Sequence, residues 1–139
     1  MKKNNVKYFF IIAIIIYLVF RIKNLRLRIN KLKSNRKLKK YISISEKSKD
    51  EMEVSASFYT IGNIYLFELK DYNTAIEYFQ KVIESGQKNY LEDSAMFNLG
   101  LCYKKIGKKE KARHFFLRVI EMFPKTARAK DAELEISRL

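Results

Sequence analysis

Apolar residues recur every three or four positions in two stretches of the chain, which is the spacing of one face of an α-helix. The members of the two faces are Phe58, Ile61, Tyr65 and Leu69, and then Met96, Leu99, Tyr103 and Ile106. The first three members of the second face follow those of the first at an offset of 38 residues, and the fourth follows at 37. A further amphipathic segment follows each of them, and these two segments, which begin at Ala75 and Ala112, are 37 residues apart. Self-similarity at this period predicts a repeated helical hairpin and an all-α fold.

Small residues occur at matching places in the two predicted hairpins. Gly62 and Gly100 fall in the middle of their helices, where Gly costs about 1 kcal/mol relative to Ala. Such a residue is tolerated where a neighbouring backbone must come close. Ala75 and Ala112 are the small residues that allow a close approach in the second helices. Phe79 and Phe116 follow them one turn later as predicted core residues.

Polar residues and glycines mark the ends of these helices. Ser48, followed three positions later by Glu51, is typical of a capping box and predicts a helix start. Asp71 and Thr126 are predicted N-caps, and Gly107 is a predicted C-cap. The last helix runs from Ala127 to Leu139.

The N-terminal part of the chain holds an unbroken apolar run, Tyr8–Phe20. As a helix it spans about 20 Å, which is less than the roughly 30 Å of a hydrocarbon core. Val6 and Ile22 lengthen the run, and the flanking Lys and Arg can extend their charges to the interface. No small-residue cleavage site follows, so residues 1–23 are expected to form an uncleaved membrane anchor. A cleaved signal and a buried soluble helix are the alternatives.

Basic residues cluster immediately after this run. Ten Lys or Arg lie between Arg21 and Lys40 and three lie before the run, which favours a cytoplasmic C-terminal domain over a periplasmic one. Residues 24–47 are interpreted as a basic amphipathic stalk and linker. One helical face carries Ile22, Leu25, Ile29 and Leu32. That helix either lies along an acidic membrane surface or forms a solvated stalk. The apolar phase is lost after Leu32, so 34–48 are expected to be linker.

The net charge of +14 belongs to the N-terminal segment. Residues 1–40 hold 13 of the 29 Lys and Arg and no Asp or Glu, so the rest of the chain is nearly neutral. Basic residues beside an apolar run indicate anionic lipid rather than nucleic acid. One cysteine, Cys102, and one histidine, His114, on different predicted helices provide neither a disulfide nor a metal site. No cofactor and no enzymatic activity are expected.

The spacing of these residues resembles the tetratricopeptide-repeat (TPR) family. The second repeat carries its signature through Met96, Leu99, Gly100, Tyr103, Gly107, Ala112, Phe116, Val119 and Pro124. The first carries it through Phe58, Ile61, Gly62, Tyr65, Ala75 and Phe79. The first repeat has one extra residue between its helices and lacks the terminal proline. The tail, with its Phe-Pro pair and Ala-rich helix, is more weakly similar to bacterial envelope TPR proteins, the BamD-like and Tol-Pal-associated proteins.

The resemblance implies a right-handed α-solenoid over residues 48–139. It would contain one hairpin at about 55–88, a second at about 93–126 and a capping helix at 127–139, behind the N-terminal anchor helix. Two repeats are few for a continuous core, so flanking helices act as caps or another subunit completes the stack.

The resemblance also implies a protein partner, a peptide or a helix held in a groove formed by the first helices. By family position the groove residues are Tyr59, Asn63, Leu66, Phe67, Phe97, Leu101, Lys104 and Lys105. These side chains either line an open groove or are covered by the linker helix. The expected function is a membrane-tethered interaction module, and the alternative is a periplasm-facing accessory subunit of an envelope assembly complex.

Overall fold

The computed structural model describes the chain from residue 2 to 85 and from 91 to 139, without the side chains of residues 2–7 and 9. These ranges contain helices and no strand, so the predicted all-α class is confirmed. The elements are α1 (Lys2–Lys47), α2 (Glu51–Asn63), η1 (Ile64–Leu69), α3 (Tyr72–Glu84), α4 (Glu92–Lys105), α5 (Lys109–Met122) and α6 (Ala127–Ile136).

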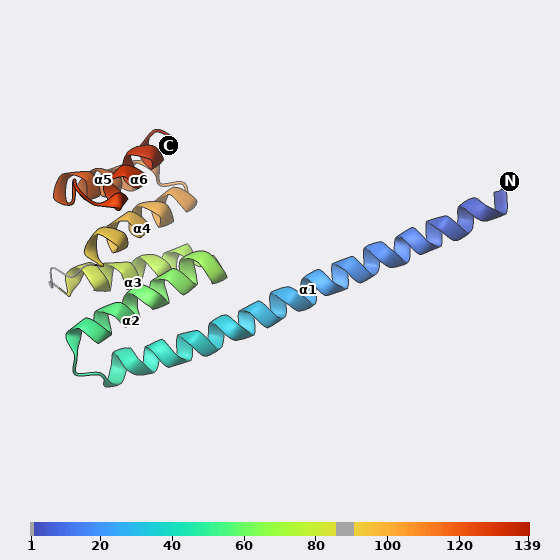
Figure 1. The fold of residues 1–139 in the computed structure, drawn as a ribbon, viewed down its shortest axis with the longest axis horizontal. Helices are drawn as coiled ribbons and strands as arrows, with labels where there is room; N and C mark the ends of the chain where they lie inside the picture. Colours follow the sequence, from blue (N-terminus) through green and yellow to red (C-terminus); the bar gives the residue numbers. More distant parts are fainter. Residues whose placement is uncertain (1, 86–90) are drawn as a thin grey trace.

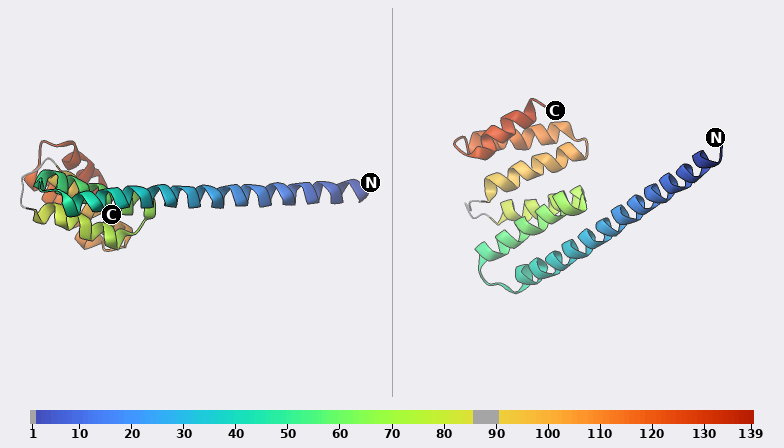
Figure 2. Two further views of the ribbon diagram at one scale, coloured as in Figure 1. Left: turned by 90° about the horizontal axis from the view of Figure 1, so that it is seen from below. Right: turned by 45° about the vertical axis from the view of Figure 1, so that its right-hand side comes forward.

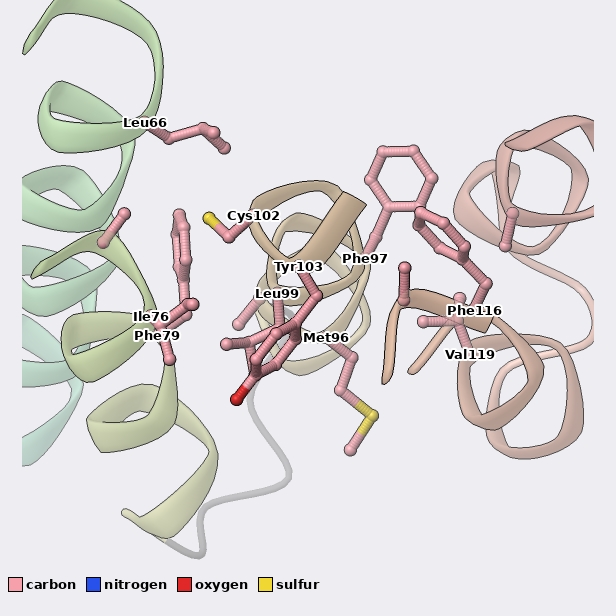
Figure 3. Close-up of a cluster of buried hydrophobic side chains, with 14 of the residues drawn as sticks. Leu66, Ile76, Phe79, Met96, Phe97, Leu99, Cys102, Tyr103, Phe116 and Val119 are labelled. Atoms are coloured by element: carbon pink, nitrogen blue, oxygen red, sulfur yellow. The ribbon is translucent and has the colours of Figure 1, made fainter. Parts of the chain in front are cut away.

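Helices α2 to α6 stack side by side in chain order, and α1 lies against the α2 end of the stack and then projects away from it (Figure 1). The predicted hairpins are α2 with α3 and α4 with α5, and α6 packs on α5 as the closing helix. One apolar core runs through the stack and includes Phe79 from α3, Leu99 from α4 and Phe116 from α5 (Figure 3). The stack therefore buries a continuous core with two hairpins because a helix covers each end.

The two mid-helix glycines each face an aromatic ring. A Cβ atom added to Gly62 would lie 2.7 Å from Cε1 of Phe79, and one added to Gly100 would lie 2.5 Å from Cε1 of Phe116. Carbon atoms in contact are normally about 3.5–4.0 Å apart. The small residues are therefore required by a phenylalanine ring from the partner helix. We expected a neighbouring backbone to lie close to these glycines, and this expectation was wrong, because the neighbour is an aromatic side chain.

Three of the predicted helix ends are confirmed. Asp71 caps α3 by accepting a hydrogen bond from the Thr74 N–H (3.2 Å), and Thr126 caps α6 by accepting one from the Ala129 N–H (3.4 Å). Gly107 follows α4 with a φ of 77°, a left-handed conformation that Gly adopts without steric cost.

The predicted start of α2 is wrong by two residues. The N-cap is Asp50, whose Oδ1 accepts from the N–H groups of Met52 (2.9 Å) and Glu53 (3.4 Å). The Ser48 hydroxyl instead donates to the Glu53 carboxylate (2.6 Å). Asp is as good a cap as Ser, and Asp50 directly precedes the first helical residue.

The extra residue of the first repeat is absorbed by a π-helical turn. Lys70 donates its backbone N–H to the Tyr65 carbonyl five residues earlier, and it has a left-handed φ of 59°. In the second repeat the left-handed residue is Gly107, only four positions after the equivalent Tyr103. Both chain reversals thus use the same backbone conformation, and η1 accommodates the additional residue.

Helix α1 continues without a break to Lys47, so the expected linker over residues 34–48 is wrong for nearly all of its length. The C-terminal part of α1 is held by packing, because Leu38 (7% exposed) forms a buried cluster with Ile61 and Ile64. Tyr41 and Ile42 pack against the same cluster. Ser34, Ser43 and Ser45 therefore lie in a helix that caps the N-terminal side of the stack.

The other end of α1 extends away from the stack, as both views of Figure 2 show. Large apolar side chains from Ile11 to Ile22 are all exposed there. The predicted anchor covers residues 1–23, and the side chains of residues 1–7 and 9 lie outside the described part. Within the described residues, none of the helices has a stretch that is long and apolar enough to cross a membrane.

Candidate partner-binding surface

Two of the predicted groove residues belong to the core. Leu66 and Phe97 are both buried. The ring of Phe97 packs on Phe116 with 5.5 Å between centroids, and the guanidinium of Arg128 from α6 lies 5.1 Å from the Phe97 ring centre. Closing helix α6 therefore covers the aromatic residue that the resemblance placed in an open groove.

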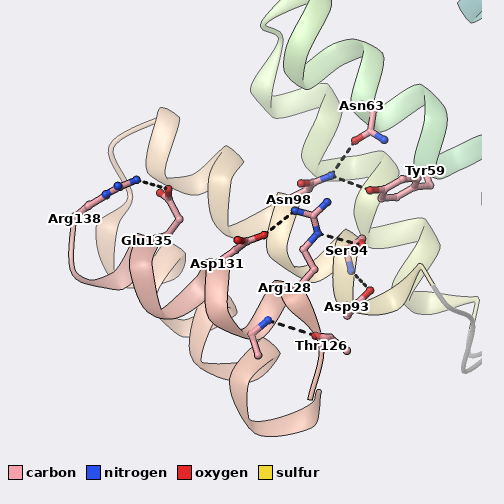
Figure 4. Close-up of polar contacts among 11 residues, drawn as sticks. Tyr59, Asn63, Asp93, Ser94, Asn98, Thr126, Arg128, Asp131, Glu135 and Arg138 are labelled. Carbon is pink, nitrogen blue, oxygen red and sulfur yellow. Dashed lines mark hydrogen bonds and ion pairs between the residues drawn. The ribbon is translucent and has the colours of Figure 1, made fainter. Parts of the chain in front are cut away.

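A polar contact joins α2 to α4 on the same side of the stack (Figure 4). Asn98, which is 3% exposed, donates its Nδ2–H to Oδ1 of Asn63 (2.9 Å) and lies 3.5 Å from the Tyr59 hydroxyl. Tyr59 and Asn63 were predicted site residues, and both remain partly exposed. Asn98 was not predicted, although a polar residue between Phe97 and Leu99 in an apolar run was an available signal.

The predicted pair of lysines is divided between two environments. Lys104 donates to the Glu135 carboxylate of α6 at 2.8 Å, and Glu135 is also 3.7 Å from Arg138. Lys105 is exposed, while Leu101 is half-buried against the core. The chain itself thus supplies a carboxylate to Lys104, and Lys105 is the exposed member of the pair.

Phe67 is an exposed member of the predicted groove, and 59% of its surface is accessible. It lies on η1 beside a hollow of about 370 Å³ between α1 and α2. The residues around this hollow come from α1, α2 and η1, and they are Lys37, Lys40, Tyr41, Thr60, Asn63, Ile64, Phe67 and Glu68. The α1 side of this surface was missed, because the sequence was interpreted as a linker there.

Glu68 attaches η1 to α1 through two contacts. Its carboxylate accepts hydrogen bonds from the Lys37 ammonium (2.7 Å) and from the Ser34 hydroxyl (2.5 Å). The hydrogen bond from Lys37 and then that from Ser34 lower the pKa of Glu68 below its ordinary value. These contacts form a polar latch of Ser34, Lys37 and Glu68 beside the apolar cluster around Leu38.

The thiol of Cys102 is buried in the core. Burial raises the pKa of the Cys102 thiol to about 12, so the reactive thiolate is scarce at neutral pH. His114 is exposed on α5 and contacts Phe115. In the ranges described, no cluster of His, Cys, Asp or Glu is able to hold a metal ion.

The family model of the tetratricopeptide repeat matches residues 53–125 of this chain, which is more than half of the 139 residues. The chain belongs to the TPR family. No curated protein matches it. A TPR domain indicates a protein–protein interaction module. The first helices of its hairpins are α2 and α4, and they carry the partly exposed Tyr59, Asn63 and Leu101 and the exposed Lys105.

The TPR signature residues pack between the two helices of each hairpin. Ala75, Phe79, Tyr103, Ala112 and Phe116 are buried, and the Tyr65 and Tyr103 rings stack on Tyr78 and Phe115 respectively. Pro124 is exposed in the turn before α6. The signature residues therefore build the scaffold.

Proposed function

We propose that this protein is a membrane-tethered TPR scaffold, which holds a segment of a partner protein close to a lipid bilayer. The observation that carries the proposal is the continuity of α1: one helix bears exposed apolar side chains at one end and packs on the TPR domain at the other. A tether and an interaction domain are thus joined without a flexible connection.

The exposed apolar end of α1 supports the tether. Ile12, Ile14, Ile15 and Tyr17 lie on different sides of the helix, because each residue turns the chain by about 100°, and each has more than half of its surface exposed. Each buried side chain of this size gains about 1.5–3 kcal/mol on leaving water, so a helix surrounded by such residues favours an apolar medium. The basic side chains from Lys23 onward suit anionic headgroups next to that medium. The apolar end and the adjoining basic residues together support insertion at a membrane.

The exposed parts of α2 and α4 support partner binding. Tyr59 and Asn63 retain surface beside the buried Asn98, and Lys105 projects from the end of α4. An aromatic ring, an amide and an ammonium group can provide an apolar contact and hydrogen bonds for a peptide backbone or a carboxylate. The preferred partner is therefore a segment of another protein and not a small metabolite.

The tether is tested by carbonate extraction of membranes that contain the full chain. We expect the protein in the pellet, and we expect the variant Ile12→Arg/Ile15→Arg in the supernatant, because two charges in the apolar stretch each oppose insertion by about 2.5–3.5 kcal/mol. Leu117→Arg, at an exposed position of α5, is the matched control and stays in the pellet. Complete extraction of the unaltered chain contradicts the tether. Mass spectrometry should find Met1 or Lys2 at its N-terminus, and a mature end after Phe20 supports a cleaved signal instead.

The side of the membrane is a separate question. Because ten basic residues follow the apolar run and three precede it, we expect a reporter fused after Leu139 to be active in the cytoplasm. Strong activity of an alkaline phosphatase fusion would reverse this orientation and support a periplasm-facing accessory subunit.

Partner binding is tested by site-specific photo-cross-linking in intact membranes. A photoreactive residue in place of Lys105 on α4 should cross-link to a partner, whereas the same residue in place of Arg113, exposed on α5, should not. Cross-links that arise only from position 113 would show that the partner docks on the opposite helices.

A further inference from the structure

Two hollows flank the exposed ring of Phe67 where α1 passes over η1. The first has a volume of about 370 Å³ and lies toward Tyr41 and Thr60. The second has a volume of about 410 Å³ and is lined by Asn30, Lys33, Ser34, Lys37, Phe67 and Glu68. Phe67 and the Lys37–Glu68 pair belong to both, so the hollows form one surface, here called the Phe67 surface.

The charges of the Phe67 surface are mostly positive. The lining residues include three lysines, Lys33, Lys37 and Lys40, and one carboxylate, Glu68. Glu68 is already engaged by the Lys37 ammonium and the Ser34 hydroxyl. Lys33 and Lys40 therefore present positive charge on the two sides of the ring, which favours an acidic ligand.

The ring of Phe67 supplies the apolar part of this surface. Its neighbour Leu66 points into the core and is buried, whereas Phe67 is 59% exposed, so the π turn presents one of two adjacent apolar residues to solvent. An exposed aromatic residue between hollows is typical of an anchor at a protein interface, where aromatic side chains dominate binding. A ligand that covers the ring needs an apolar group of its own.

We propose that the Phe67 surface binds an acidic segment of a partner protein, in which an apolar or aromatic side chain packs on Phe67 and flanking carboxylates pair with Lys33 and Lys40. This inference rests on the proposed function and names the chemistry of the partner. The site includes α1, which lies before the residues matched by the TPR family, so its selectivity is a property of this chain.

The position along α1 favours a protein over lipid as the occupant. Lys33 and Lys40 follow Ile22, the last residue of the apolar run, by 11 and 18 positions. At 1.5 Å per helical residue these distances are roughly 16 and 27 Å along the axis. The polar layer on each side of a hydrocarbon core is only about 5–8 Å thick. A tethered helix that stands upright thus holds the Phe67 surface beyond the headgroups.

The experiment uses the full chain in phosphatidylcholine nanodiscs as bait for a phage library of random 12-residue peptides. We expect selected peptides to be rich in Asp and Glu next to Phe, Leu or Tyr. Phe67→Ala should weaken their binding by at least about tenfold, as expected for an aromatic anchor. Lys40→Glu should weaken it by about three- to tenfold at low salt and by less at high salt, because charge at the rim acts mainly on association. Met122→Ala and Lys130→Glu, exposed on α5 and α6, are the matched controls and should leave it unchanged.

Three results would overturn the inference. Selected peptides that are basic, or that bind Phe67→Ala as well as the unaltered chain, would exclude this surface as the site. Loss of binding on Leu101→Glu alone would place the peptide on α4, and the proposed function would stand while this inference fails. If the library yields no peptide and Lys40→Glu reduces affinity for phosphatidylglycerol vesicles, the surface binds lipid instead. If the library yields no peptide and Phe67→Ala abolishes self-association, the surface binds a second copy of the chain. If neither peptides nor cross-linked partners are found, both proposals fail.

Discussion

Because Gly100 lies against the Phe116 ring, we expect Gly100→Ala to destabilise the protein, whereas helix propensity alone predicts that it stabilises. Replacement of a mid-helix glycine by alanine should stabilise a helix by about 1 kcal/mol. The added Cβ of Gly100→Ala would lie 2.5, 2.7 and 2.9 Å from three carbons of the Phe116 ring. Normal contact needs about 3.5–4.0 Å, so ring and backbone must separate by roughly 1 Å.

Phe116 has little room for that shift. The side chain is fully buried, and its ring packs against Phe97 on α4. Forcing extra carbon into a packed core costs about 1–3 kcal/mol, which exceeds the gain in propensity over most of that range. We therefore expect Gly100→Ala to lower the free energy of unfolding by about 1 kcal/mol, and the melting temperature by about 4–8 °C. Gly100→Leu should unfold the second hairpin.

The assay is thermal unfolding of the full chain in detergent micelles, followed by circular dichroism at 222 nm. A double-variant cycle with Phe116→Leu isolates the contact, because the smaller side chain removes the ring that the new Cβ would meet. In the Phe116→Leu background, Gly100→Ala should stabilise by up to about 1 kcal/mol, so the sign of the effect reverses. A melting temperature that rises with Gly100→Ala in the unaltered background would refute the reasoning.

Three further predictions follow from the latch, the buried thiol and the chain reversal. Because the pKa of Glu68 is lowered in the folded state, its contribution to docking α1 is complete above the ordinary value of 4.5 and is lost as the pH falls through the lowered value. Spin labels at Asn35→Cys and Lys70→Cys should therefore move apart in acid, and an unchanged distance with Glu68→Gln at pH 7 would contradict this. Cys102 should react with a disulfide reagent at pH 8 only as fast as the domain unfolds, and a rapid reaction of the folded chain would show an accessible thiolate. Lys70→Gly should stabilise the domain by up to about 1 kcal/mol and Gly107→Lys should destabilise it by a similar amount, measured by urea unfolding; opposite signs would exclude backbone strain at these positions.

The hairpins could be predicted from the sequence because their signals are local. Gly100 and Phe116 lie 16 residues apart in one repeat, and the same pair recurs as Gly62 and Phe79, so the repetition itself identified the contact surfaces. The N-caps at Asp71 and Thr126 need only the few residues that follow each of them. Information within a single hairpin was sufficient for these features.

The features that the sequence did not reveal concern contacts between distant parts of the chain. The helical state of residues 34–47 depends on packing of Leu38 against Ile61 and Ile64, and helix propensity alone is a weak guide where tertiary contacts decide. Lys104 was placed at the groove by family position, and its ion pair with Glu135, which lies 31 residues later in α6, was not predicted. The sequence indicated that α6 exists, but it did not indicate which α4 side chains the helix covers.

The uninterrupted course of α1 has a mechanical consequence. A helix advances about 1.5 Å and turns about 100° with each residue. The number of residues between Ile22 and Ser34 therefore sets the distance and the rotation of the TPR domain relative to the apolar end of α1. One inserted residue in this interval would turn the domain by about 100° around the helix axis while raising it by only about 1.5 Å. Seven inserted residues would raise it by about 10 Å and return it nearly to its original direction. The length of an insertion can thus change the orientation of the TPR domain and its distance from the apolar end of α1 separately.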